Sequence, residues 1–172
     1  MQSLITSKTR IKLLIKFFLN SSTKGYLRGL SKEFDESTNG IRKELNSLTK
    51  AGYLRVTKND SNKKLYTANK THPLYDILHQ IVLKELGLDH IVASVLDRMG
   101  GVKRIIVIGD YANGLDTGVI DVVVEGEALN TDYIGTLSDK MKQKINRSVR
   151  FLLCANYQEK GLELYNVSKD GK

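Results

Sequence analysis

The residues whose types and spacing could carry chemistry lie in one glycine-rich stretch in the second half of the chain. Two runs of apolar and β-branched residues, Ile105–Ile108 and Val119–Val124, predict two strands that are buried on both faces. Asp121 is the only charge within these runs. Because burying an unpaired carboxylate is costly, Asp121 must have a cationic partner, a metal ion or a position at the rim of the sheet.

The glycine turn between these strands resembles the core motif of minimal nucleotidyltransferases. That motif is Gly-Ser, a short spacer with a further glycine, and Asp-x-Asp on the next strand. Gly109 and Gly114 match the glycines, and Asp121 matches the second aspartate. In that family the glycine and serine hold a triphosphate, and the aspartates, with a third acid from a later strand, hold metal ions. The resemblance implies a nucleotide site at this turn.

Two substitutions remove the chemistry that the resemblance implies. Asp110 replaces the serine, and Val119 replaces the first aspartate. A carboxylate at position 110 directs negative charge at the phosphate position, and two-metal catalysis needs several carboxylates. The later strand, expected at Val149–Cys154, contains no acid. We therefore expect no catalytic residue, no metal site and no cofactor. The degenerate remnant of a nucleotide site consists of Gly109, Asp110, Gly114 and Asp121.

Charge is divided unevenly along the 172 residues. Residues 1–72 carry 15 Lys and Arg and 5 Asp and Glu, a net charge of +10, whereas residues 73–172 carry 12 and 14, a net charge of −2. A basic block beside a nearly neutral one is typical of a nucleic-acid-binding domain joined to a domain with another task. A membrane-spanning run and a signal peptide are both absent, and the single cysteine excludes an internal disulfide, so a cytoplasmic location is expected.

Apolar spacing in the basic block predicts three short helices and a hairpin. The first helix begins after Thr6 or Ser7, the second covers Tyr26–Phe34, and the third begins after Ser37 or Thr38 and ends at Ala51-Gly52, where glycine favours helix termination. Two strands, Tyr53–Val56 and Lys64–Thr67, flank a cationic loop. This order predicts a winged helix-turn-helix, and the segment Ser37–Leu54 resembles bacterial winged-helix regulators of the ArsR and MarR type.

The third helix is expected to enter the major groove of double-stranded DNA with its first turn leading. Arg42 has the donors for a bidentate contact to guanine, and Asn39 has the groups for one to adenine. The lysines are expected to contact phosphates. The predicted DNA-binding residues are Thr38, Asn39, Arg42, Lys43, Lys58, Lys63 and Lys64.

Two amphipathic helices in residues 73–100 connect the halves, and we expect a homodimer through their apolar faces; packing on the chain's own second domain is the alternative. The predicted domains are therefore 1–72, 73–100 and 101–172, in an α+β fold whose last domain has a mixed sheet. Together with the glycine turn, the wing exit Tyr66–Tyr75 and the stretch Ile145–Val149 resemble prokaryotic transcriptional regulators fused to a nucleotidyltransferase-like domain.

The remaining segments carry weaker signals. Asn130–Asp132 can cap a helix at Tyr133–Lys144, and a short strand is expected at Leu162–Tyr165 before a loose tail at 168–172. Cys154 is expected to be a small buried residue, and the spaced histidines, at surface or cap positions, offer no zinc pattern. A second basic cluster, read mainly as an exposed helix face, consists of Lys140, Lys142, Lys144, Arg147 and Arg150.

These observations favour a DNA-binding transcriptional regulator whose second domain is a catalytically inactive nucleotidyltransferase-like scaffold or sensor. A nucleotide or a protein is the expected class of effector. Two alternatives remain open from the sequence. One is an active nucleotidyltransferase that is targeted by its winged helix, and the other is an antitoxin-like module that binds a partner protein.

Overall fold

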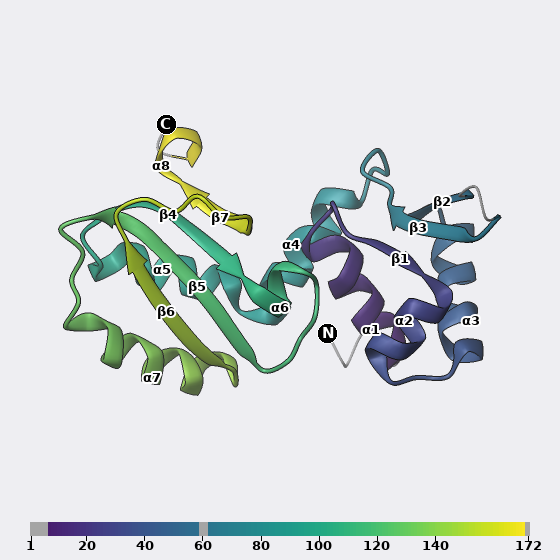
Figure 1. Cartoon of the computed structure of the whole chain (residues 1–172), viewed down its shortest axis with the longest axis horizontal. Helices are drawn as coiled ribbons and strands as arrows, with labels where there is room; N and C mark the ends of the chain where they lie inside the picture. Colours follow the sequence, from purple (N-terminus) through teal and green to yellow (C-terminus); the bar gives the residue numbers. More distant parts are fainter. Residues whose placement is uncertain (1–6, 59–61, 171–172) are drawn as a thin grey trace. The chain divides into compact units, whose positions relative to one another are not determined.

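The computed structural model describes residues 7–58 and 62–170, and the chain divides into two compact units, residues 1–82 and 83–172 (Figure 1). The division falls within the helix α4 (Tyr75–Leu86). The three-part division predicted from sequence places its boundaries at 72 and 100, and that division stays a prediction.

Four helical segments build the first unit. They are α1 (Lys8–Leu14), the π-helix η1 (Ile15–Leu19), α2 (Leu27–Phe34) and α3 (Thr38–Lys50). Their apolar faces meet in one core, and the chain reverses at Asp35, which has a left-handed φ of 51°. The core includes Leu13, Phe17, Phe18, Leu30, Ile41 and Leu45, each at most 2% exposed.

A small antiparallel sheet completes the first unit. Its strands are β1 (Lys24–Tyr26), β2 (Leu54–Lys58) and β3 (Lys64–Ala68), in the order β1-β3-β2. The β2–β3 hairpin follows α3 directly, so the unit has the winged helix-turn-helix arrangement that the sequence predicts. The tip of the hairpin, residues 59–61, lies outside the described residues.

The helix α4 contacts the first unit through its aromatic and histidine side chains. Tyr75 lies against Phe18 with ring centroids 5.7 Å apart, and His79 Nδ1 donates to the Phe18 carbonyl oxygen at 2.6 Å. The opposite side of this segment exposes apolar side chains: Leu74, Ile77 and Ile81 are 41%, 54% and 41% exposed. Their spacing of three and four residues places them on one stripe.

A mixed four-stranded sheet forms the centre of the second unit. The strands β4 (Gly101–Ile108), β5 (Val119–Glu127), β6 (Ser148–Cys154) and β7 (Leu162–Asn166) lie in the order β6-β5-β4-β7. β5 pairs antiparallel with β4 and parallel with β6, whereas β7 pairs antiparallel with β4. The short helix α6 (Gly109–Ala112) lies in the turn between β4 and β5.

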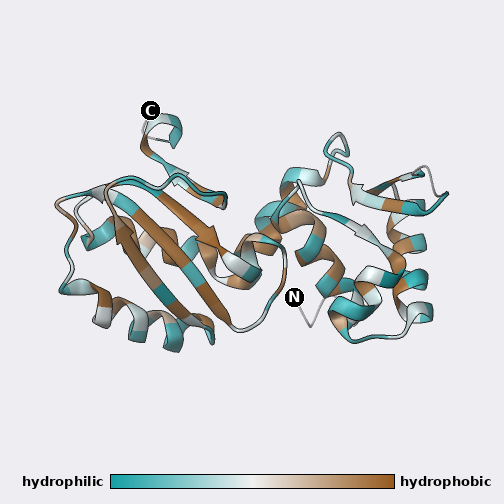
Figure 2. Cartoon of the chain, in the orientation of Figure 1, coloured by the Kyte–Doolittle hydropathy of each residue, from teal (hydrophilic) through white to brown (hydrophobic). Residues whose placement is uncertain are grey.

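The helices α5 (Leu88–Arg98) and α7 (Tyr133–Ile145) cover one face of this sheet (Figure 1). The central strands β4 and β5 are apolar along most of their length (Figure 2). Ile105, Val107, Ile120, Val122 and Val124 are at most 1% exposed, and their alternation along the strands places them on the face towards the helices.

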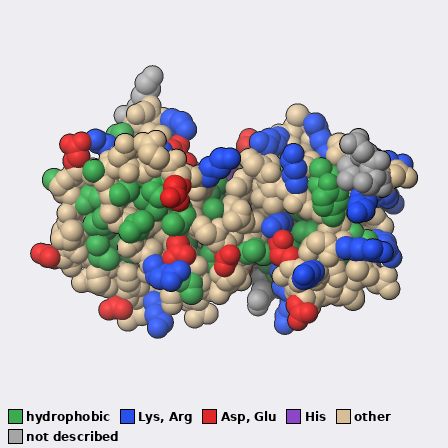
Figure 3. Space-filling view, viewed as in Figure 1, with side chains coloured by type: hydrophobic (Ala, Val, Ile, Leu, Met, Phe, Trp, Pro, Cys, Tyr) green, Lys and Arg blue, Asp and Glu red, His purple; other side chains and the backbone are tan. Residues whose placement is uncertain are grey.

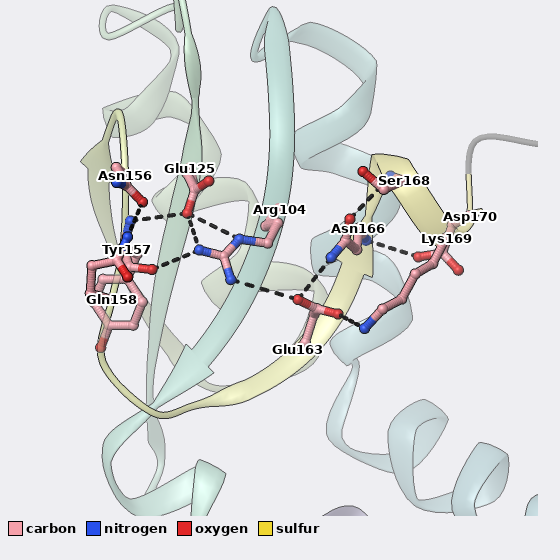
Figure 4. A network of polar contacts seen from close by, with 10 residues as sticks. All are labelled: Arg104, Glu125, Asn156, Tyr157, Gln158, Glu163, Asn166, Ser168, Lys169 and Asp170. Atoms are coloured by element: carbon pink, nitrogen blue, oxygen red, sulfur yellow. Dashed lines mark hydrogen bonds and ion pairs between the residues drawn. The ribbon is translucent and has the colours of Figure 1, made fainter.

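The chain crosses the other face of the sheet between β6 and β7, which lie at opposite edges. This connection is fixed by Arg104 of β4 (Figure 4). Arg104 donates to Glu125 of β5 from Nε at 3.0 Å and to the Tyr157 carbonyl oxygen at 2.7 Å, and Tyr157 N donates to Glu125 at 3.0 Å. The guanidinium of Arg104 lowers the pKa of Glu125 below its ordinary value.

Three local expectations from the sequence were wrong. Val167–Asp170 forms the short helix α8, where a loose tail was expected; residues 171–172 lie outside the described residues. The residue before α7, Asp132, makes no side-chain capping bond. Cys154 is only half-buried, because it ends the edge strand β6. Within the described ranges, none of the helices has both the length and the apolar character needed to cross a membrane.

Gly87, between α4 and α5, allows a test of the packing in the second unit. Its φ is +74°, and an added Cβ would lie 2.3 Å from Ile145 Cγ2 of α7. Gly87→Ala is expected to lower the free energy of unfolding by about 2–4 kcal/mol, from left-handed strain and overpacking together. Chemical denaturation followed by circular dichroism measures this loss.

The matched control is Gly135→Ala in α7, where an added Cβ meets nothing within 4 Å. This change is expected to be neutral or to stabilise by up to about 1 kcal/mol, since alanine favours helix over glycine. Equal losses in both variants would contradict the packing described here.

Candidate nucleic-acid interface

The helix α3 presents one face to solvent because its opposite face belongs to the core. Ser37 caps its first turn by accepting from Gly40 N at 3.2 Å. Ile41, Leu45 and Leu48 are at most 5% exposed. The helical period then directs the predicted DNA-binding residues of α3 outward, and all of them are exposed: Thr38, Asn39, Arg42 and Lys43.

Ion pairs connect α1 to α3 and to the turn before it. Arg10 Nε contacts Glu44 Oε2 at 2.7 Å, and Lys12 Nζ contacts Glu36 Oε1 at 2.8 Å. Burial acts to raise the pKa of Glu36, but hydrogen bonds from Lys12 and Thr9 bring it below its ordinary value. These contacts place Glu44, the only acid within α3, and Glu36 of the turn beside α1.

The exposed face of α3 borders a hollow of about 810 Å³. The start of α2 and the base of the wing form its other walls. Among the described residues that line it, two are tyrosines, four are cations and none is acidic. The lining residues are Tyr26, Leu27, Arg28, Gly29, Arg42, Asn46, Lys63, Lys64 and Tyr66.

Arg28 and Asn46 were not identified from the sequence. Arg28 reaches this face because β1, directly before α2, pairs with β3 of the wing. A three-residue strand, Lys24–Tyr26, has too little pattern to be identified, and its partner lies 40 residues later. Asn46 lies one helical turn after Arg42, so the period of α3 could have placed it there. Figure 3 shows Lys and Arg side chains gathered around hydrophobic side chains on the first unit.

The wing contributes two lysines that face each other across its strands. Lys58 and Lys64 are cross-strand partners in the β2–β3 ladder, and both are exposed. Like charges placed directly opposite each other destabilise a strand pair. Lys63 precedes Lys64 and lines the hollow. The structure therefore brings together, on one face, Arg42 of α3 and the wing cations Lys63 and Lys64.

The glycine turn of the second unit contains Gly109, Asp110 and Gly114, and Asp121 lies on the strand that follows. Gly109 has a φ of +67°, and a Cβ placed there would lie 3.4 Å from Asp121 Oδ2. Asp110 is exposed in the first turn of α6, whereas Gly114 is buried with a φ of +76°. The turn therefore brings Gly109 beside Asp121 and leaves Asp110 in solvent.

Asp121 has a cationic partner, which is one of the three environments expected from its position in an apolar strand. Arg150 of β6 donates to both of its oxygens, from Nε at 2.6 Å and from Nη2 at 2.8 Å. The parallel register of β5 and β6 places these two residues directly opposite each other. A bidentate guanidinium thus occupies the space where a cation bound by Asp121 would lie. Within the described residues, no three His, Cys, Asp or Glu side chains form a metal-binding group.

A second acid in the turn, Asp116, also has an arginine partner. Arg147 donates to it from Nε at 3.0 Å and from Nη2 at 2.6 Å, and the fully buried Tyr111 hydroxyl donates to the same carboxylate. Burial and the contact with Asp116 raise the pKa of Tyr111 to about 12. This cluster was missed because its members are up to 36 residues apart, and it shows that Arg147 does not lie on an exposed helix face. Arg150 is exposed, but it lies in the strand β6 and not in a helix.

Comparisons with known proteins give limited similarity. No family model and no curated protein matches the chain. Among solved structures, YusO from Bacillus subtilis is similar with 14% identity and a TM-score of 0.39 over 53% of this chain and 61% of its own. The adhesin competence repressor AdcR from Streptococcus pyogenes (17%, 0.39) covers 56% and 72%, and the transcriptional regulator BldR from Sulfolobus solfataricus (12%, 0.38) covers 56% and 66%.

This chain therefore spans about three fifths of the length of YusO. Two of these proteins are named a repressor and a transcriptional regulator.

The Asp116 cluster generates a prediction about pH. Burial acts to raise the pKa of Asp116, but hydrogen bonds from Arg147 and Tyr111 lower it below its ordinary value. A lowered folded-state pKa means that the contact stabilises the fold fully above about pH 4 and is lost as the pH falls below that. Arg147→Met is expected to cost about 1–3 kcal/mol at pH 7, with the difference from wild type shrinking at pH 3.

Urea unfolding at both pH values measures this difference. Lys144→Met, at an exposed position of the preceding helix, is the matched control and is expected to change stability by less than about 0.5 kcal/mol. An Arg147→Met loss that stays constant from pH 7 to pH 3 would show that Asp116 is not its partner.

Proposed function

We propose that the protein is a DNA-binding transcriptional regulator. The observation that carries this proposal is the cationic face formed by the start of α2, by α3 and by the described part of the wing. Four cations, Arg28, Arg42, Lys63 and Lys64, line one hollow beside α3, and none of the described residues that line it is Asp or Glu. Such a concentration of positive charge around an exposed helix is the electrostatic footprint of nucleic-acid binding.

On this proposal α3 enters the major groove and its first turn contacts base edges. Arg42 donates to a guanine, while Lys43 and the wing lysines contact phosphates. The cross-strand pair Lys58 and Lys64 supports the phosphate assignment. Two lysines opposite each other repel in the free protein, and a phosphate between them turns that repulsion into attraction.

The second unit is proposed to be a nucleotidyltransferase-like domain that has no catalytic activity. Its order of strands and helices, with the turn Gly109–Ala112 between antiparallel strands and the parallel pair β5–β6, supports the resemblance drawn from the sequence. Asp110, Val119 and the Asp121–Arg150 ion pair support the inactivity, because the serine and the first aspartate of the motif are replaced and Asp121 is engaged by a guanidinium. Such a unit acts as a scaffold or as a sensor of a nucleotide or protein effector.

A homodimer is proposed through the exposed stripe on α4. Leu74, Ile77 and Ile81 form an apolar surface on a segment that is tied to the first unit by His79. A two-fold pairing of this helix would present two α3 helices to the two halves of a pseudo-palindromic site.

Binding to DNA tests the central proposal. The wild-type chain is titrated against tiled fragments of its own upstream region at about 150 mM salt, where specific sites are typically bound at 10⁻⁸–10⁻¹¹ M. Arg42→Ala is expected to weaken binding to the preferred fragment by about 1–3 kcal/mol and to reduce its advantage over other fragments.

Lys64→Ala is the matched control for charge. It is expected to weaken binding to all fragments alike and to reduce the slope of log K against log salt by about 1. If the wild type binds every fragment equally, or none, the proposed regulator function is wrong.

A metal-binding test addresses the second unit. The variant with Asp110→Ser, Val119→Asp and Arg150→Asp together is expected to acquire Mn²⁺ affinity that the wild type lacks, because it restores the serine and the missing acids around Asp121. Calorimetric titration measures the binding, and Asp121→Ala in the same background should abolish it. Mn²⁺ binding by the wild type beside Asp121 would contradict the proposed inactivity.

A further inference from the structure

Two residues on the exposed face of α3 are bonded to each other. Arg42 Nη1 donates to Asn39 Oδ1 at 3.0 Å, and both side chains are exposed. Residues three apart on a helix are neighbours on its surface, so the backbone itself brings this pair together. We propose that Asn39 is a positioning residue that presents the Arg42 guanidinium to a guanine, and not a separate reader of an adjacent base. This inference rests on the proposed DNA-binding function.

The bond engages the group that an independent adenine contact would need. In that contact Asn Oδ1 accepts from adenine N6 while Nδ2 donates to N7. Here Oδ1 of Asn39 already accepts from Arg42. Reaching adenine with both groups would require Asn39 to turn away from Arg42 or to share its oxygen. The two residues therefore act together on one base pair.

Arg42 keeps the donors that guanine recognition requires. A guanidinium has five N–H donors in a planar fork, and only one of those on Nη1 is directed to Asn39. The edge formed by Nε and Nη2 offers two parallel donors for guanine O6 and N7. A long side chain that is already oriented loses less conformational freedom on binding. Asn39 thus raises both the affinity and the base preference of Arg42.

The wing bounds the other side of Arg42. Arg42 and Tyr66 of β3 line the same hollow, and Tyr66 is only 4% exposed. Burial raises the pKa of the Tyr66 phenol, and the nearby charge of Arg42 opposes this rise. The guanidinium therefore lies between an asparagine on its own helix and a fixed aromatic residue of the wing, which restricts the directions in which it can project.

A double-mutant cycle on DNA binding by the full chain tests this inference. The fragment is the tightest binder selected by the wild type from a randomised pool, and each base pair of the site is then replaced in turn. Arg42→Ala is expected to lower affinity by about 5- to 100-fold and to remove the preference for one guanine. Asn39→Ala is expected to weaken the preference for that same guanine and to lower affinity about 3- to 10-fold. In the Arg42→Ala background, Asn39→Ala should cost less than about 2-fold, because residues that act together are not additive.

Two companion variants separate positioning from other roles. Asn39→Asp keeps the acceptor for Arg42, so it should retain the guanine preference while its negative charge weakens binding to all fragments. Lys43→Ala, on the same helix, should weaken all fragments alike and should add to the loss from Arg42→Ala. Thermal melting followed by circular dichroism establishes that each variant is folded.

The results of this cycle decide whether Asn39 positions Arg42 or reads a base independently. If Asn39→Ala changes the preference at a different base pair from Arg42→Ala, or if the two losses add, Asn39 is an independent reader and the inference is overturned. If the wild type selects no fragment from the pool, the proposed DNA-binding function fails, and this inference fails with it before any variant is made.

Discussion

The helical period of α3 is the constraint on which the candidate interface depends. Burial of Ile41, Leu45 and Leu48 determines which side of the helix faces the core, so the polar residues between them must face solvent. The wing hairpin begins only four residues after α3 ends, so the packing of α3 also fixes where the wing starts relative to this helix. The cationic face is therefore a consequence of a hydrophobic core, and mutations in that core would displace the side chains of this face without altering any of them.

The second unit follows a different principle, in which charge is neutralised inside and around the sheet. Asp121, Asp116 and Glu125 each have an arginine partner, from Arg150, Arg147 and Arg104 respectively. These pairs join elements that are distant in sequence. They therefore help to fix the register of strands whose central residues are mostly apolar. The bidentate contact from Arg150 also engages both carboxylate oxygens of Asp121, which are the groups that a cation at this position would need.

The sequence predicted the elements whose signals are local. The capping Ser37, the apolar spacing of α3 and the left-handed Gly52 together define a helix from nearby residues alone. Features that depend on distant partners were missed, such as the pairing of β1 with β3 and the Tyr111–Asp116–Arg147 cluster. The π-helix at Ile15–Leu19 belongs to the same class, since its apolar spacing reads as an ordinary helix and only packing changes its hydrogen-bond register.

The Arg150–Asp121 pair has a consequence for how this fold can evolve. On the proposal that the unit descends from an active transferase, a guanidinium attached to the chain replaced a cation that was free to leave. Binding a metal ion at Asp121 would then require the loss of Arg150 and the gain of further acids together. Removing Arg150 alone would leave Asp121 as a single carboxylate, and an acid at position 119 alone would leave Arg150 bonded to Asp121. The ion pair thus makes metal binding at this turn depend on several substitutions made together.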